Sequence, residues 1–167
     1  MATVRTYKRT DYDQVARLFR ELSRAHRELY RLKTGGKRRP DRWFRNHLRK
    51  YGQGSLRVAE EKGRVVGVVG LIAHRGRGEI EPLVVAANNR RRGIGRLLLE
   101  SVTQEAKRRR WKVLTVGVAP RNNVAIRTFH SLGFRTLVSV DVEMRLQPPF
   151  RFVTRPGPRI AGRRFQV

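Results

Sequence analysis

The sequence predicts a mixed α/β fold, of the α+β type, in one domain. Segments with the two-residue alternation of strands and segments with the helical period of about 3.6 residues follow one another along the 167 residues. This length is close to the usual size of a single domain and is sufficient to enclose a core. We assign the domain to residues 1–147 and expect residues 148–167, rich in proline and arginine, to form a loosely attached C-terminal extension.

The first third of the chain predicts one strand and two helices. Residues 3–7 alternate in polarity, and the polar segment 10–13 is similar to a capping box. Apolar residues then recur at helical spacing from Val15 to Leu29. A Gly-Gly-Lys-Arg-Arg-Pro stretch ends this helix, and residues 40–50 predict a second helix with its larger apolar side chains and His47 on one side.

The remainder of the chain predicts strands, a central helix and a closing strand pair. The successive elements are a strand at 55–60, a strand at 64–73, a hairpin at 74–78, a strand at 79–85, a helix at 92–110, a strand at 113–118, a helix at 122–132, and a long strand or bent strand pair at 134–146. The central helix has an apolar face that we expect to be buried, consisting of Ile94, Leu97, Leu98, Val102 and Ala106.

A strand that runs into a glycine-containing basic turn is the most informative segment. Residues 80–85 are apolar enough for a buried strand, and the turn from Arg90 to Gly95 opens directly into the central helix. Free N–H groups and the positive end of the helix dipole at such a start suit a phosphate, and glycines let the backbone approach it. The segment therefore predicts a pyrophosphate-binding loop. It has neither the Walker A spacing nor the Gly-x-Gly-x-x-Gly fingerprint of dinucleotide-binding folds.

A second segment completes a family resemblance. Residues 85–95 match a Val-x-Pro-x-x-Arg/Gln-x-x-Gly-x-Gly/Ala signature at Val85, Arg90, Gly93 and Gly95, with Ala87 in the proline position. Residues 122–134 match an Asn-x-x-Ala-x-x-x-Tyr-x-x-x-Gly-Phe signature at Asn122, Ala125, Gly133 and Phe134. Found in this order and separated by one helix and one strand, the two motifs resemble those of the GNAT superfamily of acyl-CoA-dependent N-acyltransferases.

The resemblance implies a fold, a reaction and a co-substrate. The fold would be the GNAT fold, whose central sheet is mixed, mostly antiparallel and splayed at the cofactor site. Its order is a strand, two helices, three strands, a helix, a strand, a helix and a final strand pair. The implied activity is an N-acetyltransferase that moves an acetyl group from acetyl-CoA to an amine acceptor by direct attack in a ternary complex, with no metal. The region of the first two helices would contact the acceptor.

The resemblance also assigns residues to the co-substrate. The strand backbone at Leu83, Val84 and Val85 would bind the pantetheine arm and polarise the carbonyl. The pyrophosphate would be held by the segment comprising Arg90, Arg91, Arg92, Gly93, Ile94, Gly95 and Arg96. Asn122 would reach the cofactor from the other side. Other readings stay open, since Gly93 and Gly95 fit an ordinary loop-to-helix junction, Asn122 fits a plain helix N-cap, and the arginines fit a solvated basic run.

Glu81 is the candidate general base. It lies four residues before Val85 and, by strict alternation, it and Glu79 would share a face with Leu83 and Val85. A carboxylate there could take the amine proton through a water or bind an ammonium substrate. The alternative is a strand-edge carboxylate paired with one of the many arginines.

Two positions depart from the family pattern. Phe129 stands where the family has a tyrosine that protonates the leaving thiolate, so this side chain has no proton to give. The neighbouring His130 is rotated by about 100° around the helix and is expected at the surface. Gly117 stands where ribosomal-protein-type amino-terminal acetyltransferases have an acidic residue, which counts against membership of that subgroup.

The charge is strongly positive, with 39 Lys+Arg against 13 Asp+Glu and a net charge of +26. Such a field favours polyanions, including RNA, in a non-specific way, but an arginine-rich composition explains it equally. A second function therefore stays open: an acyl-CoA-binding regulatory or nucleic-acid-associated module with weak or no catalysis. Cysteine is absent, which excludes disulfides. With no signal-type start and a longest apolar run of nine residues, 65–73, we expect a cytoplasmic monomer or homodimer without a membrane partner.

Overall fold

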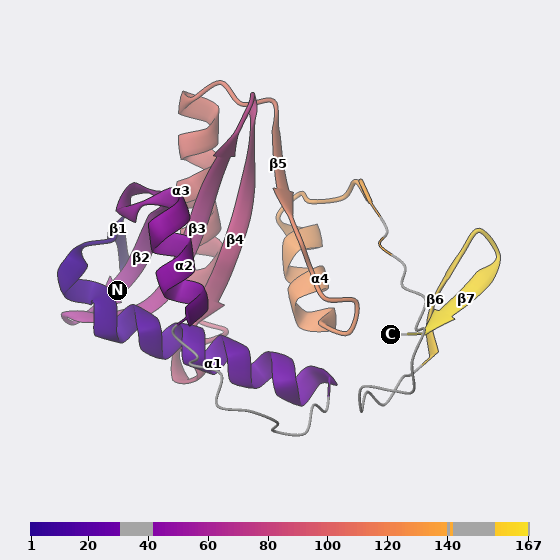
Figure 1. The fold of residues 1–167 in the computed structure, drawn as a ribbon, viewed down its shortest axis with the longest axis horizontal. Coiled ribbons are helices and arrows are strands. Elements are labelled where there is room, and N and C mark those ends of the chain that lie inside the picture. Colours follow the sequence, from indigo (N-terminus) through magenta and orange to yellow (C-terminus); the bar gives the residue numbers. More distant parts are fainter. Residues whose placement is uncertain (31–41, 140, 142–155, 167) are drawn as a thin grey trace. The chain divides into compact units, whose positions relative to one another are not determined.

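The computed structural model describes residues 1–30, 42–139, 141 and 156–166. Its elements are β1 (Thr3–Thr6), η1 (Arg9–Asp11), α1 (Tyr12–Tyr30), α2 (Arg42–Tyr51), η2 (Gln53–Ser55), β2 (Leu56–Glu61), β3 (Arg64–His74), β4 (Arg77–Val85), η3 (Ala87–Asn89), α3 (Ile94–Arg108), β5 (Val113–Val116), α4 (Asn123–Ser131), β6 (Pro156–Ile160) and β7 (Arg163–Gln166) (Figure 1). The chain divides into two compact units, residues 1–24 with 37–117 and residues 25–36 with 118–167. Among the described residues, no helix is both long and apolar enough to cross a membrane.

The first unit is built on a five-stranded sheet in the order β1-β2-β3-β4-β5. The first three pairings are antiparallel, and β4 with β5 is parallel. The mixed, mostly antiparallel sheet that the sequence predicts is therefore confirmed. Up to α4, the order of the helices and strands is also as predicted, and these elements begin and end within about two residues of their expected bounds.

Helices cover both faces of this sheet. On one face α3 packs closely, since a Cβ added at Gly67 of β3 would lie 2.9 Å from Leu98 Cδ1 and 3.3 Å from Ile94 Cγ2. On the other face α1 and α2 contribute Phe19 and Phe44, whose ring centroids are 4.7 Å apart, to the buried core. The buried face of α3 differs slightly from the prediction, because Leu99 is buried while Leu97 is only half-buried.

The C-terminal region departs most from the sequence-based expectation. Residues 134–139 carry no strand, and Leu137 and Val138 are exposed. Residues 140 and 142–146, the rest of the predicted final strand, lie outside the described residues. The last two strands instead form a separate hairpin, β6 with β7, inside the segment expected to be a loose extension. Its tight turn has positive φ at Ala161 and Gly162, as two-residue hairpin loops require.

Candidate active site

A bulge in β4 determines how the candidate base is presented. Val69 lies opposite Leu83 and Leu71 opposite Ile80, so the single residue Gly70 faces two residues of β4, Glu81 and Pro82. An extra residue in one strand reverses the alternation of its side chains on passing the bulge.

The four predicted positions therefore fall on two faces of the sheet. Val85 is opposite Gly67, on the side of α3, and Leu83 shares that side. Glu79 is opposite Ile72, and Ile72 lies on the same side of the sheet as Gly70, the side that α2 covers. Glu81 follows Glu79 by two residues, so both glutamates lie on the α2 side. The prediction that both glutamates share a face with Leu83 and Val85 is wrong, because strict alternation does not allow for an inserted residue.

The bulge depends on the absence of a side chain at Gly70. A Cβ there would lie 1.9 Å from the carbonyl oxygen of Glu81, which is far inside van der Waals contact. The same Cβ would lie 3.2 Å from Cε1 of His47 on α2. Gly70 therefore permits the Glu81 backbone to press against β3, and the His47 ring closes the site from the helix side.

His47 is a site residue that sequence reasoning placed on α2 but did not assign to the site. It is buried, and burial lowers its pKa, so the ring is neutral near pH 7. Its Nε2 lies 3.1 Å from Ser55 Oγ, and that hydroxyl donates to the Gly52 carbonyl at 2.7 Å. Because the serine proton is used in this way, we assign the proton to His47 Nε2 and leave Nδ1 as an acceptor.

The two glutamates of β4 differ in their partners. Glu79 pairs with His74 at 2.9 Å. The half-buried Glu81 has no hydrogen-bond or ion-pair partner among the residues that the structure describes. A hydrogen bond to Tyr51 raises the pKa of Lys50 on α2, and the charges of Glu81 and Glu79 add to this. Among the described residues, Glu81 is therefore a carboxylate without a direct partner, and the charge of Lys50 acts on the same region. A carboxylate without a partner can bind an ammonium group or accept a proton.

Beyond the bulge, β4 offers unpaired backbone along one edge. β5 pairs with β4 only from Arg77 to Ile80, and the two strands then separate (Figure 1). Ala86 N donates to Val66 O of β3 at 2.9 Å, so the alternate residues Leu83 and Val85 direct their N–H and C=O groups toward the open edge. This edge can bind the amide groups of an extended ligand in the manner of an added strand.

The open edge leads into the loop that the sequence predicts to bind pyrophosphate. Arg91 and Gly93 both have positive φ, 60° and 78°, which turns the chain sharply before α3 starts at Ile94. No side chain caps this helix, so the N–H groups of Ile94, Gly95 and Arg96 are free of a side-chain partner. The arrangement suits an anion, because uncapped N–H groups and the helix dipole act together.

The two motif glycines have different roles. The left-handed φ of Gly93 favours glycine whatever surrounds it, and nothing lies within 4 Å of a Cβ added there. Gly95 is helical, and its added Cβ would meet Val85 Cγ2 at 3.7 Å, an ordinary contact. The protein itself therefore tolerates a side chain at Gly95, and only a ligand on the loop would exclude one.

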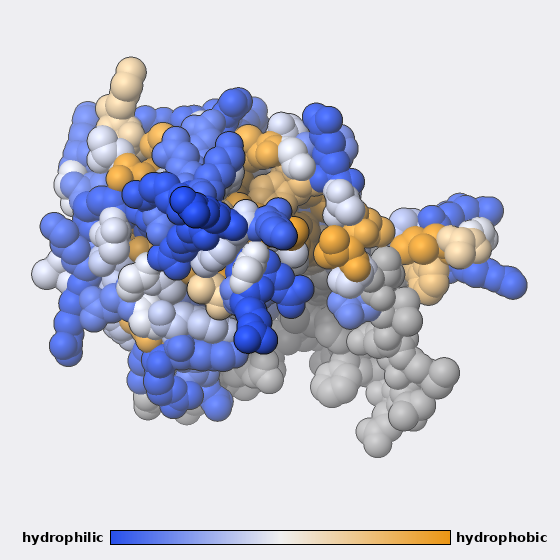
Figure 2. Space-filling view, turned by 90° about the horizontal axis from the view of Figure 1, so that it is seen from above, coloured by the Kyte–Doolittle hydropathy of each residue, from blue (hydrophilic) through white to orange (hydrophobic). Residues whose placement is uncertain are grey.

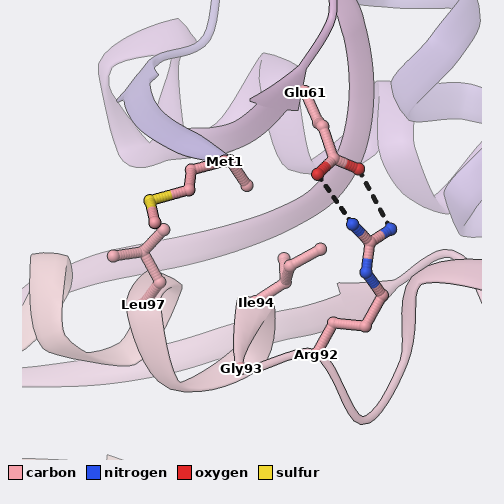
Figure 3. Close-up of a pocket in the computed structure, with 7 residues that line it drawn as sticks. Met1, Glu61, Arg92, Gly93, Ile94 and Leu97 are labelled. Carbon is pink, nitrogen blue, oxygen red and sulfur yellow. Dashed lines mark hydrogen bonds and ion pairs between the residues drawn. The ribbon is translucent and has the colours of Figure 1, made fainter.

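Most of the loop arginines are bound to the protein itself. Arg92 donates two hydrogen bonds to Glu61 at the end of β2, at 3.1 and 2.8 Å (Figure 3). Asn89 Nδ2 donates a third to Glu61 at 3.3 Å. Arg90 Nε donates to Val85 O at 3.1 Å, and Arg96 pairs with Glu100 at 2.8 Å.

The role of Glu61 is invisible in the sequence, because Glu61 precedes the loop by about thirty residues. The pair that it forms with Arg92 borders a cavity of about 350 Å³, lined by Met1, Ala2, Glu61, Arg92, Gly93, Ile94 and Leu97 (Figure 3). Neither the phosphate-partner reading nor the solvated-run reading of Arg92 anticipated this contact. The loop therefore presents backbone amides, with Arg91 as the predicted arginine that has no such anchor among the described residues.

Two predicted residues belong to the second unit. Asn122 caps α4, its Oδ1 accepting from Ala125 N at 3.1 Å, so the helix-cap reading is confirmed and a cofactor contact stays a prediction. Phe129 is buried, with its ring centroid 5.6 Å from that of Phe134. His130 is exposed, as expected.

Comparison with known proteins gives consistent results. The family model described as "Acetyltransferase (GNAT) family" matches residues 15–134. An uncharacterised N-acetyltransferase of Methanocaldococcus jannaschii is 28% identical over 139 residues, which cover 79% of this chain and 60% of that protein, so the chain spans well under two thirds of its relative's length.

Solved structures share the fold. A GNAT-family acetyltransferase from Staphylococcus aureus has a TM-score of 0.68 at 18% identity, covering 91% of this chain and 96% of its own. The PaiA N-acetyltransferase of Thermoplasma acidophilum, solved in complex with coenzyme A, has a TM-score of 0.67 at 15% identity, covering 84% and 93%. Because the family model matches residues 15–134, which is most of the chain, the chain belongs to the GNAT family of acetyltransferases.

Proposed function

We propose that the protein is an N-acetyltransferase that moves an acetyl group from acetyl-CoA to an amine acceptor by direct attack in a ternary complex. Membership of the family supports acetyl transfer in general. The observation that supports this site is the continuity of three features in β4 and the loop after it. Among the described residues, a carboxylate without a partner at the bulge, a backbone edge that no strand covers and a helix N-terminus without a side-chain cap follow one another along the chain. At that edge, within the part of the chain that the structure describes, only the Val85 carbonyl has a partner, the Arg90 side chain.

In this proposal the backbone supplies most of the binding. The edge at Leu83 and Val85 holds the pantetheine arm and donates an N–H to the thioester carbonyl, which stabilises negative charge as it develops on that oxygen. Val84 takes no part through its backbone, because its N–H and C=O groups face β3. The amides of the loop from Arg91 to Arg96 hold the pyrophosphate. A contact of Asn122 with the co-substrate stays a prediction from the family resemblance.

Glu81 is the proposed base. Its carboxylate takes a proton from the acceptor amine, directly or through one water, while the nitrogen–carbon bond forms and the carbon–sulfur bond breaks. The leaving thiolate takes a proton from solvent, because Phe129 has none to give. The buried, neutral His47 lies beside Gly70 on the helix side of the bulge, and we expect it to limit movement of the bulge from that side.

The test is turnover with acetyl-CoA and a panel of amines, followed through release of the free thiol. The protein contains no cysteine, so a thiol reagent reports coenzyme A without background from the enzyme. Glu81→Gln should lower kcat by roughly a hundredfold, with the largest loss at low pH, where the amine most needs a base. Glu79→Gln, on the neighbouring carboxylate that pairs with His74, is the matched control and should lose far less. Equal losses in both variants would remove Glu81 from this role.

A second candidate is an acyl-CoA-binding module associated with nucleic acid and having weak or no catalysis. The apolar Phe129 in the family's tyrosine position and the net charge of +26 favour it. The two candidates separate in one experiment. A protein that is stabilised by acetyl-CoA and retains RNA, yet turns over no amine in the panel, is the module rather than the enzyme.

A further inference from the structure

A dense group of cations lies at the end of the first unit that is remote from the pyrophosphate loop. It combines the turn between β3 and β4 with the connection from α3 to β5. Lys112 N donates to Gly76 O at 3.3 Å, and Arg77 pairs in register with Val113. Two segments separated by about thirty residues in the sequence therefore form one surface.

Trp111 holds these two segments together. Its ring lies directly over Gly78, where an added Cβ would be 2.5 Å from Trp111 Cζ3, and the Arg109 guanidinium lies 5.2 Å from the ring centroid. Two backbone hydrogen bonds connect this segment to the end of α3. Trp111 N donates to Ala106 O at 3.0 Å, and Arg110 N donates to Lys107 O at 2.9 Å. These bonds close α3 with a Schellman-type end, so the connection has a defined conformation.

We name this surface the basic platform, and it consists of Arg75, Arg77, Lys107, Arg108, Arg109, Arg110 and Lys112. All of these residues are exposed. Figure 2 views the structure toward this end, and hydrophilic side chains cover much of the face of the first unit that it shows.

The charge of the basic platform is poorly compensated. Two carboxylates lie nearby and both are engaged, Glu79 with His74 and Glu105 with Arg57, Arg108 and Arg109. The five other cations have no carboxylate partner among the described residues. Cations near a helix C-terminus complement its dipole, which accounts for part of the group. The dipole does not account for Arg75 and Arg77, which lie on the sheet.

We propose that the basic platform is a docking surface for the phosphate backbone of a nucleic-acid duplex. Guanidinium groups match phosphate oxygens in charge and geometry. The five cations without a carboxylate partner all project from α3, from the β3–β4 hairpin or from the structured connection to β5, rather than from a free tail. The Trp111 ring is covered by Gly78 and approached by Arg109, so it is not free to stack on the bases of a single strand.

An anionic membrane fits the basic platform less well. Proteins that bind at a lipid interface insert large apolar side chains beside their cations. Val113 is the large apolar residue that is exposed at this end of the described first unit. The inference goes beyond acetyl transfer, because the fifteen residues of α3, roughly 22 Å at 1.5 Å per residue, separate this surface from the pyrophosphate loop.

The test uses two full-length variants of equal charge. The platform variant carries Arg75→Gln, Arg77→Gln, Arg110→Gly and Lys112→Gln. Arg110 has a φ of 56°, a conformation that glycine prefers, so its replacement removes a charge without adding strain.

The control variant removes four exposed arginines from other parts of the first unit, with the changes Arg9→Gln, Arg20→Gln, Arg24→Gln and Arg64→Gln. Each variant lowers the net charge of +26 by four. Stabilisation by acetyl-CoA, followed by thermal unfolding, should persist in both variants, which shows that both are folded.

Binding to a labelled 20-base-pair DNA duplex is measured across a range of salt concentrations. The platform variant should lose roughly a hundredfold in affinity at low salt. Its slope of log affinity against log salt should fall by about three, because each lost phosphate contact removes about 0.9 from the slope. The control variant should change its slope by less than about one.

Three results would overturn the proposal. Equal losses in the two variants would show that the charge acts diffusely over the whole surface. Tighter binding of a single strand than of the duplex would contradict recognition through the duplex backbone. A wild-type preference for phosphatidylserine vesicles that the platform variant loses would assign the surface to a membrane. None of these readouts depends on acetyl transfer, so failure here leaves the proposed enzyme untouched.

Discussion

Gly70 is the residue at which one added carbon should have the largest effect on stability. A Cβ there would overlap the Glu81 carbonyl, an atom of a paired strand that cannot rotate away. We expect Gly70→Ala to lower the free energy of unfolding by about 3 kcal/mol, the upper part of the range for overpacked interiors. Urea unfolding measures this. Gly54→Ala, where no atom lies within 4 Å, is the control, and similar losses in the two variants would mean that β4 moves away freely.

We expect Glu61 to affect co-substrate binding through the loop whose Arg92 it holds. Its side chain is only 17% exposed and accepts three hydrogen bonds, two from Arg92 and one from Asn89. Glu61→Gln keeps the shape but loses the charge, and one charge-assisted bond contributes about 1.5–3 kcal/mol. We expect KM for acetyl-CoA to rise about tenfold while kcat changes little, because the acceptor side is untouched.

Steady-state kinetics with varied acetyl-CoA checks this prediction. Glu100→Gln is the matched control, since Glu100 also pairs with an arginine of the same region, Arg96, but is exposed on the helix surface. A fall in kcat with an unchanged KM would show instead that Glu61 influences the reacting groups.

At the level of elements, the corner between β1 and α1 depends on pH. Hydrogen bonds from Arg5 at 2.7 and 2.8 Å hold the pKa of the buried Asp11 below its usual value near 3.8, and Lys8 N adds a third bond. A lowered pKa contributes stability that is present above the unfolded value and is lost as pH falls through the folded value. We expect wild-type stability to fall more steeply than that of Asp11→Asn as pH drops below the usual value near 3.8. Urea unfolding at each pH measures this, and Asp13→Asn, on an exposed carboxylate, should keep the wild-type profile.

A substitution at the start of α3 can test ligand binding without a large effect on folding. The Cβ of a valine at Gly95 would make only an ordinary contact with Val85 in the protein, but the side chain would stand where a pyrophosphate meets the helix amides. Gly95→Val should therefore abolish the thermal stabilisation by acetyl-CoA and leave the melting temperature without ligand within a few degrees of the wild type. Differential scanning fluorimetry gives both values. An undiminished ligand-induced shift would place the cofactor elsewhere.

Periodicity and turn chemistry were sufficient to predict most elements. The apolar spacing of α1 and α3 and the Lys62-Gly63 turn between β2 and β3 are local signals, and the structure confirms them. The strand prediction is wrong for residues 134–139, because an apolar alternation such as that near Leu137 becomes a strand only when another strand pairs with it. The local sequence does not determine that pairing.

The candidate site shows the same limit more sharply. The loop from Arg90 to Gly95 could be predicted, because glycines before a helix are a local pattern. The side on which Glu81 lies could not, since it depends on a bulge formed with Gly70 of another strand. The Glu61 anchor likewise joins residues about thirty positions apart.

For the whole molecule, the net charge of +26 should act on the rate at which acetyl-CoA arrives. Its phosphates are attracted by a positive field, and salt screens that attraction over about 10 Å at 0.1 M. We expect kcat/KM for acetyl-CoA to fall severalfold between 20 and 300 mM salt, with kcat nearly constant. Initial rates at low acetyl-CoA concentration check this, and a flat profile would mean that the charge has no influence on encounter.

The separation of the pyrophosphate loop and the basic platform along α3 has one further consequence. Two ligands about 22 Å apart do not compete, so an enzyme on a duplex would keep its co-substrate site open. A basic protein bound to the same duplex would then meet the enzyme as a tethered neighbour, at an effective concentration set by their spacing rather than by its amount in solution. A strongly positive enzyme that would repel a lysine-rich acceptor in free solution would, on this shared polyanion, be brought to it.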